Sequence, residues 1–206
     1  ALVVAGNISG DELKTLAEKY FGAWKSGVLP ERKTSSPIST KAKLVLVDKP
    51  GAPQTAIRVA TLGPARTTPD YEKIQVMNAA LGGTSTSRIN NNLREEKGYS
   101  YGVYSGMLYQ RQSGTFAVRG SVRTDVTTPA LQEVFKEIKG ISANPPDAKE
   151  LSRAIGSQML SLPGQFDTGA ATAGAIASLS THDFRLDYDS KIPQRFGAVT
   201  QTELID

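Results

Sequence analysis

The chain of 206 residues contains no cysteine and a single histidine, His182. Without cysteine it cannot form disulfides, thiolate metal sites or iron–sulfur clusters, and it has no cysteine nucleophile. One histidine excludes a metal site built on two histidines of this chain, and a Ser-His-Asp triad would have to use His182. A cysteine-free composition suits both the cytosol and the periplasm and does not decide between them.

The sequence also lacks long apolar runs and basic runs. No segment approaches the roughly 18 consecutive apolar residues of a membrane-spanning helix. Lys and Arg number 24 against 20 Asp and Glu, and the net charge of +4 is spread along the chain. A nucleic-acid-binding protein usually concentrates its positive charge, so we expect neither a nucleic-acid partner nor a membrane partner.

The apolar periodicity predicts an α+β fold with a mostly antiparallel sheet and helices packed on one face. We expect strands at residues 2–5, 43–48, 54–62, 99–109 and 115–123, the last two forming a hairpin. We expect helices near residues 9–27, 68–81, 87–97, 128–141, 147–161, 168–179 and 188–198.

Residues 28–42 contain two prolines and five Ser or Thr residues without apolar periodicity, which is typical of a linker. The chain starts inside a predicted strand. It ends just after Thr200–Glu203, a capping box that should open a helix. Both features lead us to expect a fold truncated at both ends.

Three patterns that could carry chemistry also have structural explanations. The Gly82–Ser87 segment lacks the lysine of a phosphate-binding P-loop and follows a helix, which favours a helix–helix break. His182 adjoins Asp183, but no G-x-S-x-G motif supplies a nucleophile, so we expect a solvent-facing loop histidine. Four acidic residues offer paired carboxylates but are typical of solvated helix surfaces: Glu95, Glu96, Asp147 and Glu150.

The segment 93–102, with sequence LREEKGYSYG, carries the strongest candidate. Arg94 falls in the last turn of a predicted helix, Gly98 reverses the chain, and Tyr99 and Tyr101 point the same way on the following strand. A guanidinium and a phenol can thus donate hydrogen bonds to a peptide carbonyl and to the oxyanion that it becomes during hydrolysis. The structural alternative is that cations favour helix C-termini and tyrosines pack well in strands.

Residues 78–83, 87–88 and 93–103 resemble the M16 metallopeptidases, which include pitrilysin, insulin-degrading enzyme and mitochondrial processing peptidase. Residues 3–8 and 20–24 are similar to the V-V-x-G-D-I and Y-F-G-x-W segments of that family, with Asn7 in place of the usual Asp. The resemblance covers nearly the whole chain. It implies the fold of these peptidases, the LuxS/MPP-like metallohydrolase fold.

In the family, one domain binds zinc through H-x-x-E-H and a downstream Glu. The other carries an Arg and a Tyr, seven positions apart, that reach the substrate across a closed chamber. The matching residues are Arg94 and Tyr101, which the resemblance assigns to the scissile-bond carbonyl and the tetrahedral intermediate.

The H-x-x-E-H motif is absent from this sequence. The resemblance therefore implies that this chain has no metal ligand or cofactor. It implies that the zinc is bound by a partner, an H-x-x-E-H domain or subunit. It also implies that the chain alone is inactive. The substrates would be unfolded peptides. The alternative is a catalytically inactive, structural or peptide-binding M16-like subunit.

The resemblance also implies a domain organisation. Residues 1–27 would be the final β-α unit of a preceding M16 domain, residues 28–42 a linker, and residues 43–206 the C-terminal M16 domain without its last β-α unit. The missing strand would leave an unpaired sheet edge, which we expect Leu2–Ala5 to fill within one chain or by strand exchange between copies. Bacterial relatives of this kind are often exported, so the resemblance favours a periplasmic location, and the cytoplasm is the alternative location.

Overall fold

The computed structural model describes residues 1–28 and 41–204. The chain divides into two compact units, one of residues 1–4 and 52–206 and a smaller one of residues 5–51. The larger unit contains three strands, β1 (Gln54–Gly63), β2 (Val103–Tyr109) and β3 (Gly114–Arg123). Its α-helices are α2 (Tyr71–Asn78), α3 (Arg88–Asn90), α4 (Thr127–Ala143), α5 (Ala148–Ser161), α6 (Gly169–Thr181) and α7 (Ile192–Gly197).

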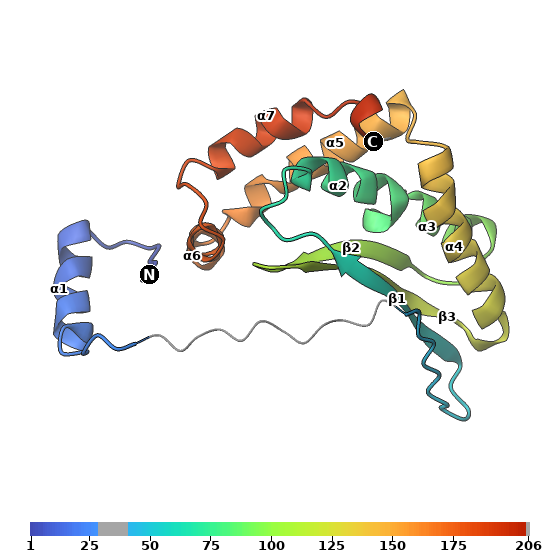
Figure 1. The fold of residues 1–206 in the computed structure, drawn as a ribbon, viewed down its shortest axis with the longest axis horizontal. Helices are drawn as coiled ribbons and strands as arrows, with labels where there is room; N and C mark the ends of the chain where they lie inside the picture. The colour runs from blue at the N-terminus through green and yellow to red at the C-terminus, as the bar shows by residue number, and fades with distance from the viewer. Residues whose placement is uncertain (29–40, 205–206) are drawn as a thin grey trace. The chain divides into compact units, whose positions relative to one another are not determined.

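The three strands form an antiparallel sheet in the order β1-β3-β2 (Figure 1). The predicted hairpin is confirmed, with Val103 of β2 opposite Gly120 of β3. β2 begins four residues later than expected. The reason is a turn before it, in which the Gly102 N–H donates to Ser100 Oγ over 2.8 Å instead of joining the ladder.

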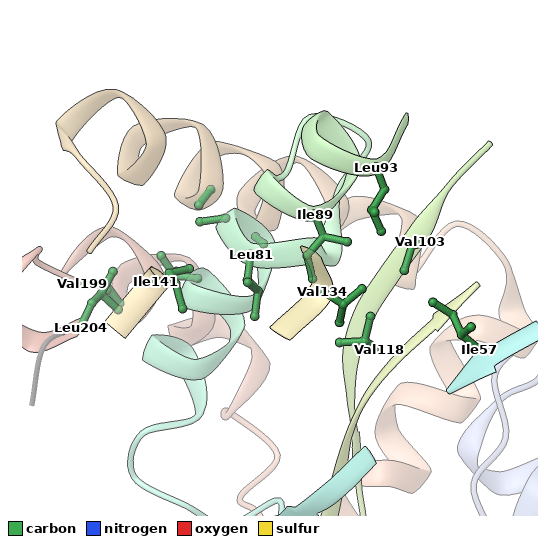
Figure 2. Close-up of a cluster of buried hydrophobic side chains, with 14 of the residues drawn as sticks. Ile57, Leu81, Ile89, Leu93, Val103, Val118, Val134, Ile141, Val199 and Leu204 are labelled. Carbon is green, nitrogen blue, oxygen red and sulfur yellow. The ribbon is translucent and has the colours of Figure 1, made fainter. Parts of the chain in front are cut away.

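One face of this sheet is covered by helices, which confirms the predicted α+β architecture. Figure 1 shows α2, α5 and α7 on the same side of the sheet, and α4 contacts β1 and β3. In Figure 2, Val103 and Val118 of the strands point toward Ile89, Leu93 and Val134 of the helical layer. All five side chains are fully buried.

The two predicted helices at 68–81 and 87–97 each pass into a π-helical turn, at Ala79–Gly83 and Asn91–Glu96. Gly82 packs directly on β2, because a Cβ there would lie 2.9 Å from the backbone nitrogen of Ser105. The break at Gly82 therefore serves close helix–strand packing, which confirms the structural interpretation of this glycine-containing segment.

The remaining helices of the larger unit follow the predicted pattern. α4, α5 and α6 lie within two residues of their expected bounds. The segment expected at 188–198 forms a 3₁₀ turn at Asp189–Lys191 followed by α7. The longest described helix, α4, has 17 residues, and no described helix is both long and apolar enough to cross a membrane.

The predictions of strands at 2–5 and 43–48 are wrong, since neither segment is in a strand. Strands require a hydrogen-bonded neighbour, and β3 is the only partner of β1 among the described residues. The expected insertion of Leu2–Ala5 into the sheet of the same chain is therefore also wrong. Exchange of this segment between copies stays a prediction.

The smaller unit contains α1 (Gly10–Phe21), whose predicted capping box between Ser9 and Glu12 is confirmed. The helix ends before the expected stop at Gly27, because a turn in which Trp24 N–H donates to the Phe21 carbonyl follows it directly. Its predicted apolar face is not buried, with Tyr20 63% and Trp24 76% exposed. Most of the predicted linker, residues 29–40, lies outside the described residues.

Candidate functional site

Arg94 lies in the π-helical turn Asn91–Glu96, next to the fully buried Leu93. This turn is fixed on α4, because the Asn92 amide donates to Glu133 and to Glu137, each over 2.7 Å. The Arg94 side chain is 47% exposed and has its Nε 3.2 Å from the Glu95 carboxylate. An exposed ion pair of this kind is weak, so the guanidinium retains donors for another partner.

The loop after this turn is held at both ends. Gly98 adopts the left-handed conformation, with φ of +61°. The Tyr99 N–H donates to the Leu93 carbonyl over 2.8 Å, and the Tyr99 carbonyl accepts from Arg123 N–H over 3.0 Å. At the far end the Val103 N–H donates to Asn90 Oδ1 over 3.0 Å. The backbone that carries Tyr101 is therefore tied to the helical layer and to β3.

Tyr99 and Tyr101 differ in their surroundings. Tyr99 packs against the hydrophobic core, whereas Tyr101 is 89% exposed. The expectation that both rings share one face of a strand does not apply, because residues 99–102 are not in a strand. The structure thus presents Arg94 and Tyr101 to solvent from two segments joined by the Leu93–Tyr99 hydrogen bond, with no direct bond between the two described side chains.

A second tyrosine, Tyr104, lies beside this loop and was missed by the sequence analysis. Its ring covers Gly102, where a Cβ would lie 2.7 Å from Tyr104 Cε2 and 3.3 Å from its hydroxyl oxygen. The phenol of Tyr104 therefore extends along the uncovered face of the sheet toward the loop of Tyr101. The sequence signal that could have indicated this packing is the glycine two residues before the aromatic residue of the strand.

His182 follows the last residue of α6 and lies in a turn, in agreement with the expected loop position, but it is half-buried and not fully solvent-facing. Its Nδ1 lies 2.9 Å from the Ser178 carbonyl, and its ring stacks on Phe184. Asp183 pairs with Arg111 instead of with the imidazole. These contacts give His182 a structural role at the helix end.

The acidic candidates also have structural partners. Asp147 and Glu150 form the capping box of α5. The Glu150 carboxylate accepts from Arg88 Nε over 2.8 Å and from Arg88 Nη2 over 2.6 Å, and this guanidinium holds the pKa of Glu150 below its usual range. Glu95 pairs with Arg94. No two of these carboxylates are arranged as an acid–base pair.

The residues present do not fit a zinc ion. Zinc in proteins is held by three or four Cys, His or carboxylate ligands at about 2.0–2.3 Å. Among residues 1–28 and 41–204, no group of three such side chains is placed to hold a metal. The one histidine of the sequence, His182, has its Nδ1 atom within hydrogen-bond distance of the Ser178 carbonyl. The chemistry available to the exposed Arg94 and Tyr101 is hydrogen-bond donation.

Comparison with known proteins agrees with this fold. Residues 1–157 match the model of the family described as peptidase M16 inactive domain. An uncharacterized zinc protease of Mycobacterium leprae is 27% identical over 159 residues, which are 76% of this chain and 36% of that protein. The chain thus spans about a third of the length of this curated relative.

Two solved structures are similar to this chain. A peptidase M16 inactive domain from Pseudomonas fluorescens has 25% identity and a TM-score of 0.67, covering 74% of this chain and 36% of that one. A protease from Helicobacter pylori has 16% identity and a TM-score of 0.84, covering 98% of this chain and 49% of that one. Since the family model covers most of the sequence, the chain belongs to the peptidase M16 inactive domain family.

Proposed function

We propose that this domain supplies Arg94 and Tyr101 to hold the scissile-bond carbonyl of an unfolded peptide, which is hydrolysed at a zinc site on another domain or subunit. The observation that carries the proposal is the joint exposure of the two side chains on adjoining, hydrogen-bonded segments. Neither residue is needed by the core. The family membership supports the peptide as substrate class.

The two side chains suit this role chemically. A peptide carbonyl gains negative charge as its carbon becomes tetrahedral, and donors fixed in advance stabilise that charge. The Arg94 guanidinium is permanently charged and offers several N–H groups, while the Tyr101 hydroxyl has no hydrogen-bond partner in the described part of the chain. Binding a carbonyl would exchange the weak Glu95 contact of Arg94 for a contact that strengthens in the transition state.

The same proposal explains why residues 1–28 and 41–204 contain no group of side chains placed to hold zinc. An inactive domain that acts on the substrate of a second domain needs donors and a binding surface but no metal. We accordingly propose an H-x-x-E-H domain or subunit as the partner. The greater length of the relatives supports a second domain, and the chain alone should not hydrolyse peptides.

The test is the kinetic effect of Tyr101→Phe in the complete peptidase, including the zinc-bearing partner. Loss of one oxyanion donor should lower kcat by about 10²–10³ with little change in KM. Tyr20→Phe is the matched control, because Tyr20 is also exposed and lies on α1. An unchanged kcat in Tyr101→Phe would contradict the proposal.

A further inference from the structure

The face of the sheet turned away from the helices carries a row of three exposed side chains. Arg58 of β1 lies directly opposite Arg119 of β3, and Tyr104 of β2 lies opposite Arg119 on its other side. Directly opposite residues in an antiparallel sheet have Cβ atoms about 4.5–5.5 Å apart. One carboxylate placed above the row can therefore contact both guanidinium groups.

The charges of this arginine pair are not compensated. Several other arginines have a carboxylate partner, including Arg123, which binds Asp125 over 2.9 Å. The Arg58 and Arg119 side chains make no ion pair or hydrogen bond in the part of the chain that the structure describes. Like charges directly opposite in a sheet are unfavourable. A bound anion would relieve this repulsion.

The next row along the same face is made of small residues, with Ala60 and Gly106 on either side of Ala117. A Cβ added to Gly106 would have no atom within 4 Å. Ala117 is itself buried, so the open space lies over Gly106 at the β2 side of this row, where a peptide backbone can approach the sheet.

Beyond the small row lie two leucines. Leu62 of β1 and Leu108 of β2 flank Thr115 of β3 and are 52% and 62% exposed. Leu62 is four residues from Arg58 on the same strand, a separation of about 13 Å. The face thus offers an anion site and an apolar site at the spacing of four residues in an extended peptide.

We propose that this face binds an acidic segment of the peptide substrate, with an Asp or Glu carboxylate on the Arg58–Arg119 pair. An apolar side chain four residues away rests on Leu62 and Leu108. The inference depends on the proposed function for the peptide as ligand class. Charge complementarity supports the acidic residue. The exposed leucines favour a peptide over a nucleic acid, whose phosphates would need further cations along the face.

The experiment compares two fluorescein-labelled unstructured peptides in the complete peptidase. One carries glutamate four residues from leucine, and the other is identical except for glutamine in place of glutamate. The wild-type protein should bind and cleave the glutamate peptide about five- to tenfold better. The double variant Arg58→Gln/Arg119→Gln should lose this preference and treat the two peptides alike. Arg153→Gln, an exposed arginine of α5, is the matched control and should keep the preference.

Equal treatment of the two peptides by the wild-type protein, or a preference that survives in the double variant, would overturn the proposal. Tighter binding of a single-stranded oligonucleotide than of the glutamate peptide would overturn it as well. Anisotropy measured in the Tyr101→Phe background separates this inference from the proposed function. The glutamate preference in binding should persist there whether or not Tyr101 contributes to turnover.

Discussion

Asn78 and Ser105 form two hydrogen bonds with each other across the boundary between α2 and β2. Asn78 Nδ2 donates to the Ser105 carbonyl over 3.3 Å, and Ser105 Oγ donates to Asn78 Oδ1 over 2.7 Å. Together with the bond from the Val103 N–H to Asn90 Oδ1, they attach the outer edge of β2 to the helical layer. This attachment also fixes the end of the loop that carries Tyr101.

Asn78→Ala should therefore destabilise the larger unit by about 1–3 kcal/mol, because it leaves polar groups of the buried Ser105 without partners. The free energy of unfolding in urea measures this effect. Asn91→Ala is the control, since the Asn91 amide bonds to Thr86 at an exposed position, and its cost should stay below about 0.5 kcal/mol. Equal costs for both variants would show that the contact with β2 is not important for stability.

Gly82→Ala should cost about 1–3 kcal/mol of stability, because the new methyl would collide with the Ser105 backbone nitrogen 2.9 Å away. Gly140→Ala, within α4, meets no atom within 4 Å. That control should gain about 0.4–1 kcal/mol through lower entropy of the unfolded chain. Thermal unfolding of both variants tests the prediction, and a stabilised Gly82→Ala variant would contradict the close packing of this turn on β2.

Glu150→Gln should remove an acid-sensitive part of the stability. Arg88 lowers the pKa of Glu150 in the folded protein, so this carboxylate stabilises the fold above its unfolded pKa of about 4.3. The contribution is lost as the pH falls through the lower, folded pKa. Because the pair is partly exposed, with side-chain exposures of 20% and 21%, we expect a cost of about 1–2 kcal/mol at pH 7.

The difference in unfolding free energy between wild-type protein and Glu150→Gln should therefore shrink toward pH 3, as measured by urea unfolding at a series of pH values. Asp167→Asn is the control, because Asp167 is exposed and has no ion pair among the described residues. A difference that stays constant with pH would show that the charge of Glu150 does not contribute.

The helices of the fold could be predicted better than the strands. The residues that determine a helix lie close together in the sequence, whereas a strand needs a partner from another part of the chain. The cap at Asp147 and the apolar spacing of α5 lie within a few residues of each other and predict its start correctly. Strand formation at 43–48 depends on a partner elsewhere. That segment contains a continuous run of four apolar residues, yet Leu44 is 90% exposed and is not in a strand. The π-helical turn at Ala79–Gly83 depends on contacts with β2, and the turn at Asn91–Glu96 depends on the hydrogen bonds of Asn92 to α4. Periodicity contains neither kind of contact.

Part of the site could be predicted from the sequence in the same way. Arg94 and Tyr101 follow from a contiguous motif, and both are exposed. The same-face placement of Tyr99 and Tyr101 did not follow, because the Ser100–Gly102 turn interrupts the strand alternation. The opposition of Arg58 and Arg119 depends on the register of two strands far apart in sequence. A shift of one residue between the two strands would have placed the two arginines on opposite faces of the sheet.

The most direct test of the account is a double-mutant cycle with Arg94→Ala and Tyr101→Phe, measured as kcat in the complete peptidase. Two donors to one carbonyl act as a unit, so the double variant should lose little more than the worse single variant, about 10²–10³ in kcat. Independent, additive losses or unchanged turnover in both single variants would contradict a shared role at the scissile bond.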